Sequence, residues 1–211
     1  EIYTLSLHDA LPIYQPQMDK LSYALGVSFG QQIAQSHLPI SDFESFVKGL
    51  ETVMKGTAPA VDFNECQQVL NDFFTKMQEE ENKNMATTKR EGEEFLKQNA
   101  GREGVVTTPS GLQYEVIKQG EGKKPSAADK VRVHYHGTLI DGTVFDSSVQ
   151  RGMPAEFGVT QVIKGWVEAL QLMPVGSKYK LYIPSELAYG EQGAGAMIKP
   201  HSTLKIGRAH V

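Results

Sequence analysis

The sequence predicts an α+β protein with a helical N-terminal half and a strand-rich C-terminal half. Apolar residues recur at helical spacing through residues 19–100. Residues 105–204 instead contain strand-length apolar runs, many glycines and prolines, and one helical segment. With 40% hydrophobic residues, the 211-residue chain can bury a core, which excludes a wholly disordered protein.

The two ends of the chain are set apart from this pattern. Residues 1–13 read EIYTLSLHDALPI and the last seven read KIGRAHV, and both strings resemble translated sequencing-adapter oligonucleotides. The alternative is a genuine N-terminal arm and C-terminal tail. We exclude residues 1–17, as adapter and leader before an initiator at Met18, and residues 205–211 from fold reasoning. The expected domains are then residues 18–104 and residues 105–204.

Two short helices are expected first. The first is predicted by apolar residues spaced four apart, namely Leu21, Leu25, Phe29 and Ile33. Pro39 follows and ends it. The pattern Ser41-x-x-Glu44 is a capping-box signature that begins a second amphipathic helix, and Gly56 ends that helix.

A long helix follows, over roughly residues 62–99. Asp62-x-x-Glu65 repeats the start signal, and no proline occurs between residues 60 and 108. Its apolar stripe fades after Met77, so its second half is expected to be solvated and to bridge two domains. The apolar stripes of residues 18–100 are too small to make a good core alone, which favours a homodimer. The alternative is a small helical domain folded back on itself.

The second half predicts a sheet with one helix. Strands are expected at residues 112–117, 130–138 and 178–183, with another starting at Thr203–Leu204. Asp141-Gly142 is typical of a hairpin turn. A helix is expected around residues 163–172. Short antiparallel strands around one helix complete the α+β prediction.

Composition excludes several classes of function. The net charge of −4 argues against a nucleic-acid partner, and no apolar run approaches the roughly 20 residues of a membrane span. Cys66 is the one cysteine, which excludes an intrachain disulfide, and we interpret it as a packing residue. His134 and His136 share a strand face and are a candidate metal pair, but we find no third ligand and favour ordinary strand histidines. No cofactor is expected.

A series of aromatic and turn motifs carries the strongest signal for function. In order along the chain they are Val133-His134-Tyr135-His136-Gly137, Phe145-Asp146-Ser147-Ser148, Val162-Ile163-Lys164-Gly165-Trp166 and Leu187-Ala188-Tyr189-Gly190. In type and spacing this series resembles the FKBP-type peptidyl-prolyl isomerases over residues 105–204. The resemblance implies an antiparallel sheet wrapped around one short helix.

The upstream residues resemble the bacterial two-domain branch of that family, which includes the macrophage infectivity potentiator proteins and their cytoplasmic relatives. The similarity lies in Asp19-Lys20-x-Ser22-Tyr23-Ala24-x-Gly26, in the long helix and in Pro109-Ser110-Gly111-Leu112-Gln113-Tyr114. It implies that the N-terminal helices intertwine into a homodimer. With Met18 as initiator, no export signal is present and the cytoplasm is expected; a signal peptide lost upstream would instead place the protein in the periplasm.

The resemblance also implies which residues form the site. Trp166 would be the pocket floor under the proline ring, with walls from Tyr135, Phe145, Val162 and Ile163. The Ile163 N–H and the Tyr189 hydroxyl would hold substrate carbonyls. Asp146 would polarise the amide carbon, and Arg151 would orient Asp146. Met197 and Ile198 would contribute from the flap after Tyr189. Each residue also has a plain structural interpretation: Trp166, Phe145 and Tyr135 as core aromatics, Asp146 and Tyr189 as turn residues.

The implied activity is acceleration of X-Pro isomerisation in folding chains, without covalent chemistry. Its partners would be proline-containing unfolded polypeptides and macrocyclic inhibitors. Four positions depart from common family residues and bear on inhibitor affinity: Ala155, Leu187, Lys199 and Ile206, the last standing where relatives carry a pocket aromatic. The alternative function is a non-catalytic dimeric chaperone clamp for unfolded chains.

Overall fold

The computed structural model describes residues 18–36 and 38–210, and the side chains of this range up to residue 207. The expectations for residues 1–17 lie outside this range. The described chain forms two compact units, which divide between Gln68 and Val69, inside one long helix. The boundary expected at residues 104/105, and the adapter origin of the two ends, stay predictions.

The first unit contains two short helices and the start of a third. Helix α1 covers Lys20–Gln35, with Asp19 as its cap. Helix α2 covers Phe43–Lys55 and ends at Gly56 in the left-handed region (φ 61°). The expected Ser41 cap is wrong: Asp42 caps α2, because its carboxylate accepts hydrogen bonds from the backbone N–H groups of Glu44 and Ser45.

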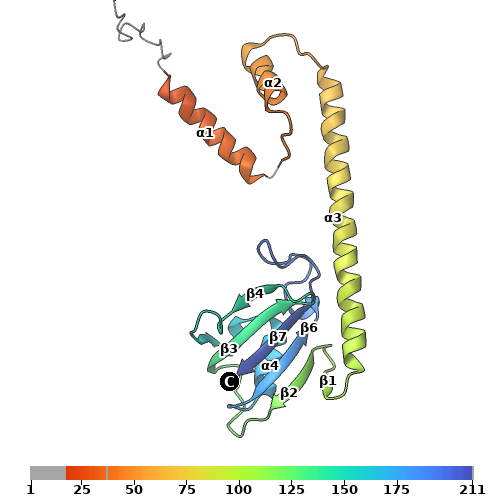
Figure 1. The fold of residues 1–211 in the computed structure, drawn as a ribbon, viewed down its shortest axis with the longest axis vertical. Helices are drawn as coiled ribbons and strands as arrows, with labels where there is room; N and C mark the ends of the chain where they lie inside the picture. The colour runs from red at the N-terminus through yellow and green to blue at the C-terminus, as the bar shows by residue number, and fades with distance from the viewer. Residues whose placement is uncertain (1–17, 37, 211) are drawn as a thin grey trace, which may run out of the picture. The chain divides into compact units, whose positions relative to one another are not determined.

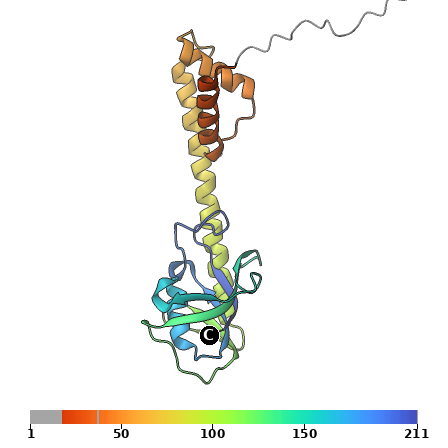
Figure 2. The same ribbon diagram turned by 90° about the vertical axis from the view of Figure 1, so that its left-hand side faces the viewer.

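Helix α3 covers Phe63–Ala100 as one uninterrupted helix, which confirms the long helix expected over residues 62–99 (Figure 2). The Asp62 carboxylate accepts the N–H of Asn64 at 2.8 Å at its start. Residues 78–84 are exposed, as the fading stripe predicts, and burial returns only near the end, at Gly92 and Asn99.

The second unit contains, besides most of α3, an antiparallel sheet around one short helix (Figure 1). Its strands are β1 Val105–Thr107, β2 Gln113–Lys118, β3 Lys130–Leu139, β4 Val144–Ser147, β5 Ala155–Gly158, β6 Lys178–Ile183 and β7 Leu204–His210. The order across the sheet is β1-β2-β6-β7-β3-β4, and β5 pairs with the start of β3. Every expected strand is present, and β4 is the second strand of the hairpin expected at Asp141-Gly142; β1 and β5 are additional.

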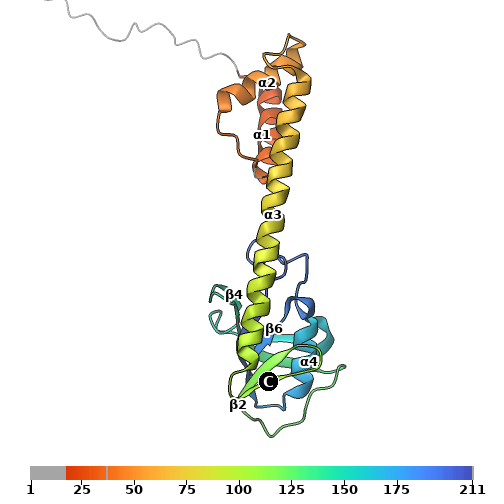
Figure 3. The ribbon, with the colours of Figure 1, turned by 90° about the vertical axis from the view of Figure 1, so that its right-hand side faces the viewer.

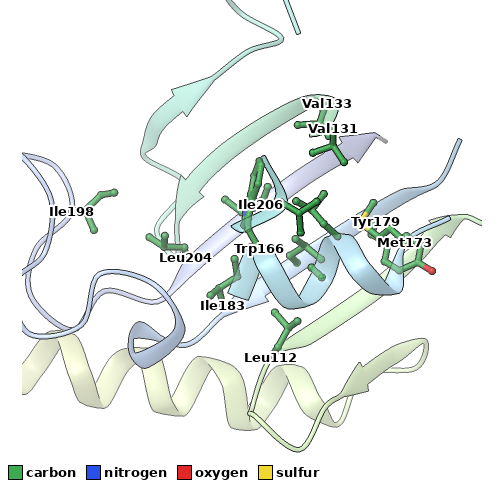
Figure 4. Close-up of a cluster of buried hydrophobic side chains, with 14 residues drawn as sticks. Leu112, Val131, Val133, Trp166, Met173, Tyr179, Ile183, Ile198, Leu204 and Ile206 are labelled. Carbon is green, nitrogen blue, oxygen red and sulfur yellow. The ribbon is translucent and has the colours of Figure 1, made fainter. Parts of the chain in front are cut away.

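Helix α4, Lys164–Leu172, covers one face of this sheet, as the sequence predicts. Its buried side chains pack against inward-facing residues of the strands, and Figure 4 shows this cluster gathered around Trp166. The last turns of α3 lie on the other face, where Phe95 contacts Tyr182 (Figure 3).

Strand β7 is central rather than peripheral, because it pairs with both β6 and β3. Its register runs from Leu139↔Leu204 through His136↔Gly207 to His134↔His210, with a shift after Gly207. Ile206 is 2% exposed and, two residues after Leu204, shares its inward face. Residues 205–210, which the sequence analysis set aside, thus continue the strand that starts at Leu204, with a register shift after Gly207.

Candidate active site

Trp166 lies in the first turn of α4, which packs closely against the sheet at Ile183. The preceding residue, Gly165, permits this approach: a Cβ there would lie only 2.5 Å from Cγ2 of Ile183. Trp166 is 6% exposed, and its ring contacts Tyr135 edge-on, with centroids 5.1 Å apart, and Phe157 at 5.4 Å. Its indole N–H has no hydrogen-bond partner among the described residues. Trp166 is therefore both a core residue and a pocket residue.

A cavity of about 470 Å³ opens beside this ring. It is lined mostly by aromatic and aliphatic side chains: Tyr135, Phe145, Asp146, Phe157, Gln161, Val162, Ile163, Trp166, Tyr189, Leu204 and Ile206. The set includes seven residues that the resemblance assigned to the site: Tyr135, Phe145, Asp146, Val162, Ile163, Trp166 and Tyr189. Segments from five different parts of the sequence thus meet at one cavity.

Strand pairing explains why Phe145 and Asp146 reach the cavity. Gly137 on β3 pairs with Asp146 on β4. A Cβ on Gly137 would lie 2.5 Å from the Phe145 ring, so the absent side chain leaves the space that the ring fills. Glycine at this position is therefore part of the site, although it contributes no functional group.

Asp146, Tyr135 and Arg151 form a hydrogen-bonded set at the edge of the cavity. The Tyr135 hydroxyl donates to one carboxylate oxygen of Asp146, and the Arg151 guanidinium donates to the other. The guanidinium also donates to the Tyr135 hydroxyl at 3.1 Å and lies 5.7 Å from the centroid of the Tyr135 ring. Arg151 does not line the cavity, but it holds Asp146 as the resemblance implies.

These contacts determine the charge on the carboxylate. Burial of Asp146 opposes ionisation, but the hydrogen bonds from Tyr135 and Arg151 outweigh burial and lower the pKa of Asp146. Burial, followed by the bond to Asp146, raises the pKa of the Tyr135 phenol. At neutral pH the edge of the cavity therefore carries an ionised carboxylate and a neutral phenol.

The two strand histidines each contact a serine at the end of β4 or directly after it. The Nδ1 atom of His136 lies 2.9 Å from Oγ of Ser147, and Nδ1 of His134 lies 3.3 Å from Oγ of Ser148. Ser148 Oγ also accepts the backbone N–H of Tyr135 at 2.8 Å. No cluster of three or more potential metal ligands occurs among the described residues. These bonds fix the strand that carries Tyr135.

Besides Arg151, two predicted binding residues, Met197 and Ile198, lie outside the set that lines the cavity. Ile198 is buried in the core cluster, and its backbone exchanges hydrogen bonds with Ala194. Met197 is exposed in the same loop. Their contact with substrate stays a prediction.

Sequence reasoning missed three residues that line the cavity, namely Phe157, Gln161 and Leu204. Phe157 stands two residues after Ala155 on β5, and Leu204 two residues before Ile206 on β7. Because side chains alternate along a strand, these spacings could have identified both. Gln161 ends a 3₁₀ turn, and its side-chain oxygen accepts the N–H of Gly158 at 2.9 Å, a contact with no periodic signal.

A larger groove of about 890 Å³ lies elsewhere on this unit and has a different character. It is lined by charged and small residues, including Lys123, Lys124, Lys130 and Arg132, with Val131 and Val175 below them. It borders residues 130–133 of β3, which within the described chain pair only with β5. It has no aromatic lining and does not suit a proline ring.

Comparison with known families gives two matches. A family described as FKBP-type peptidyl-prolyl cis-trans isomerase matches residues 121–206. The domain amino terminal to that isomerase matches residues 18–116. Both halves expected from the sequence are thus represented.

Individual relatives cover nearly the whole chain. The FKBP-type 22 kDa peptidyl-prolyl cis-trans isomerase of Escherichia coli K12 is 49% identical over 193 residues, which is 92% of this chain and 94% of that protein. The outer membrane protein MIP of Legionella longbeachae is 43% identical over 88% of this chain and 81% of its own length. The crystal structure of FkpA from Escherichia coli matches with a TM-score of 0.66 at 34% identity, covering 91% of this chain and 94% of that one.

Proposed function

We propose, from the premise that this chain belongs to the FKBP-type peptidyl-prolyl cis-trans isomerases and is an isomerase of that family, that X-Pro bonds rotate in the cavity above Trp166. The observation that carries this proposal is the combination of an apolar, aromatic enclosure with one ionised carboxylate at its edge. The substrates are proline-containing segments of unfolded polypeptides.

Isomerisation of an X-Pro bond requires an apolar environment for the twisted amide, and it requires no nucleophile. An X-Pro amide rotates over a barrier of about 18–20 kcal/mol, and at the top of that barrier it has lost its resonance. The twisted amide is less polar than the planar one. A cavity walled by Phe145, Phe157 and Trp166 therefore stabilises the twisted form relative to the planar form.

Polar groups at the edge of the cavity hold the substrate carbonyls that flank the X-Pro bond. The first N–H groups of a helix have no partner within the helix, and Ile163 stands at that position of α4 without a side-chain cap. We assign the Ile163 N–H and the Tyr189 hydroxyl as donors to substrate carbonyls. Asp146, fixed by Tyr135 and Arg151, places negative charge beside the carbon of the rotating amide.

A protease-coupled assay on a peptide of the Ala-Leu-Pro-Phe type tests this assignment. The wild-type chain should accelerate cis-to-trans conversion, and a macrocyclic FKBP inhibitor should compete for the same cavity. Conversion at the uncatalysed rate, with a folded protein, would refute the proposed role of the cavity. Weak inhibition with full activity would point to Ala155, which the resemblance places where many relatives have a large aromatic pocket wall.

A separate observation supports a second function, as a dimeric clamp for unfolded chains. None of the residues of α1 or α2 is buried, and Leu21, Phe43 and Met54 are each more than 60% exposed. We infer that residues 18–100 form a homodimer by covering these faces. We call the second unit, which contains the cavity, the isomerase unit. In a dimer, two linked isomerase units would hold one client at two sites. Sedimentation of the full chain tests this inference.

The compartment is part of the proposal. No helix in the described residues is long and apolar enough to cross a membrane. We keep the cytoplasm as the predicted location and the periplasm as the alternative. Fractionation of cells that express the complete natural gene distinguishes them.

A further inference from the structure

Helix α3 contains a single glycine, Gly92, and that residue is buried. Glycine is unfavourable inside a helix relative to alanine, so an interior glycine needs a reason from packing. The reason here is a close approach. A Cβ on Gly92 would lie 2.5 Å from Oγ1 and 3.3 Å from Cβ of Thr203.

Thr203 lies between two segments of the chain that each contain or adjoin residues of the pocket. After it, β7 places Leu204 and Ile206 in the cavity lining. Before it, His201 closes the base of the 190–201 loop, because its N–H donates to the carbonyl of Gly190 at 2.8 Å. Gly190 follows Tyr189, which lines the cavity. Figure 1 shows this loop beside the lower part of α3.

The helix is held to the sheet by hydrogen bonds that begin one turn after Gly92. Asn99, 2% exposed, donates to the side-chain oxygen of Gln113 at 2.8 Å, and Gln113 donates to the carbonyl of Leu96 at 2.9 Å. Arg102 joins the set by donating to Asn99 at 2.9 Å and to the Tyr182 hydroxyl at 3.1 Å. The end of α3 is therefore an outer layer of the isomerase unit and a fixed surface for Thr203.

We propose that Gly92 is a positioning residue for the isomerase pocket. Because Gly92 has no side chain, α3 can approach Thr203 closely. This contact sets the position of Thr203, and therefore of β7 and of the base of the preceding loop, relative to the pocket. The helix thereby affects a site that it does not touch. This inference rests on the proposed role of the cavity above Trp166.

The test is a substitution cycle in the full chain. Gly92→Ala should lower kcat/KM on a short X-Pro peptide at least fivefold, with an altered emission of Trp166, the single tryptophan and a reporter of the pocket. Thr203→Ala removes the Oγ1 atom that the new methyl group meets. The double variant should therefore recover to within twofold of wild type in both rate and emission. Glu93→Ala, an exposed neighbour on the same helix, is the matched control and should leave both unchanged.

Each outcome decides the inference. A folded Gly92→Ala protein with the wild-type rate overturns it, as does a slow variant that Thr203→Ala does not rescue. If Gly92→Ala does not fold, the double variant decides: folded and within twofold of wild type supports the inference, whereas slow or unfolded overturns it. An inactive wild-type chain would instead refute the role of the cavity, which keeps the two failures distinct.

Discussion

The N-terminal helices and the isomerase unit both have apolar faces, but the burial of those faces is very different. In α1 and α2 no residue is buried, and Met54 is 84% exposed. In the isomerase unit the inward faces of the strands and α4 enclose a continuous core. A periodic stripe thus shows which face is apolar but not what covers it. In the second unit α4 supplies the cover, and in the first we infer that a second copy does so.

Trp166→Ala should have the largest effect, because Trp166 belongs to both the core and the pocket. Truncation of a buried tryptophan costs about 3–5 kcal/mol of unfolding free energy, and the floor of the pocket is lost as well. Leu112→Ala is the matched control, since Leu112 is fully buried but does not line the cavity. Urea unfolding and the peptide assay should show that both variants lose stability and that only Trp166→Ala loses activity while folded. Equal activity of the two folded variants would contradict the assignment of Trp166.

Truncation should separate the two regions. Chains starting at Asn84 and at Gly104 should both be monomeric and isomerise short peptides, while the full chain sediments as a dimer. Both should be less efficient than the full chain on an unfolded protein. A full chain that sediments as a monomer at micromolar concentration would refute the dimer.

The two truncated chains should also differ from one another. The chain from Gly104 lacks the two hydrogen bonds that join Gln113 to Asn99 and to the Leu96 carbonyl, each worth about 0.5–1.5 kcal/mol, and the contact of Phe95 with Tyr182. It should unfold at lower urea and work more slowly than the chain from Asn84. Identical unfolding curves would show that the end of α3 adds nothing to the sheet.

Residues of the site differ in how far the sequence could predict them. Tyr135, Phe145, Asp146 and Trp166 stand in motifs with specific spacing, and the structure brings them together. Strands β1, β4 and β5, at three or four residues, are too short for a periodic signal. The docking of α3 on the sheet could not be predicted either, because it depends on contacts such as Asn99–Gln113 between segments that show no pattern.

Replacement of residues 205–211 should stabilise the isomerase unit. A strand of alternating apolar residues would pair with β3 without the register shift after Gly207 and would add inward apolar side chains beyond Ile206. Since Ile206 is already buried, each further inward side chain should add about 1.5–3 kcal/mol. Calorimetry should show a higher melting temperature, accompanied by a faster isomerase. The same strand shifted by one residue, with its apolar face outward, is the control. Equal melting temperatures would show that residues 205–211 serve as well as a regular strand.

Asp146→Ala and Tyr189→Phe should reduce activity with little change in stability, because both side chains lie partly exposed at the edge of the cavity. We expect a loss of about tenfold in kcat/KM for each, equivalent to about 1.4 kcal/mol in the barrier. Glu156→Ala, which breaks an exposed ion pair with Arg132, is the control and should leave the rate unchanged. Full rates for both edge variants on a short peptide would refute the assignment of the site.

The smallest effect should be the pH dependence of stability contributed by Asp146. Its pKa is lowered in the folded protein: burial opposes the charge, and the bonds from Tyr135 and Arg151 outweigh burial. A carboxylate with a lowered folded pKa stabilises the protein above its unfolded pKa of about 3.9, and this stabilisation is lost as the pH falls through the folded value. Because the side chain is 40% exposed, water screens the pair and the contribution should stay below about 1 kcal/mol. Urea unfolding of wild type and Asp146→Asn should therefore differ by a constant amount from pH 8 to about pH 5 and converge below about pH 4. A difference that grows on acidification would mean that the folded pKa is raised, and that burial of Asp146 outweighs its hydrogen bonds.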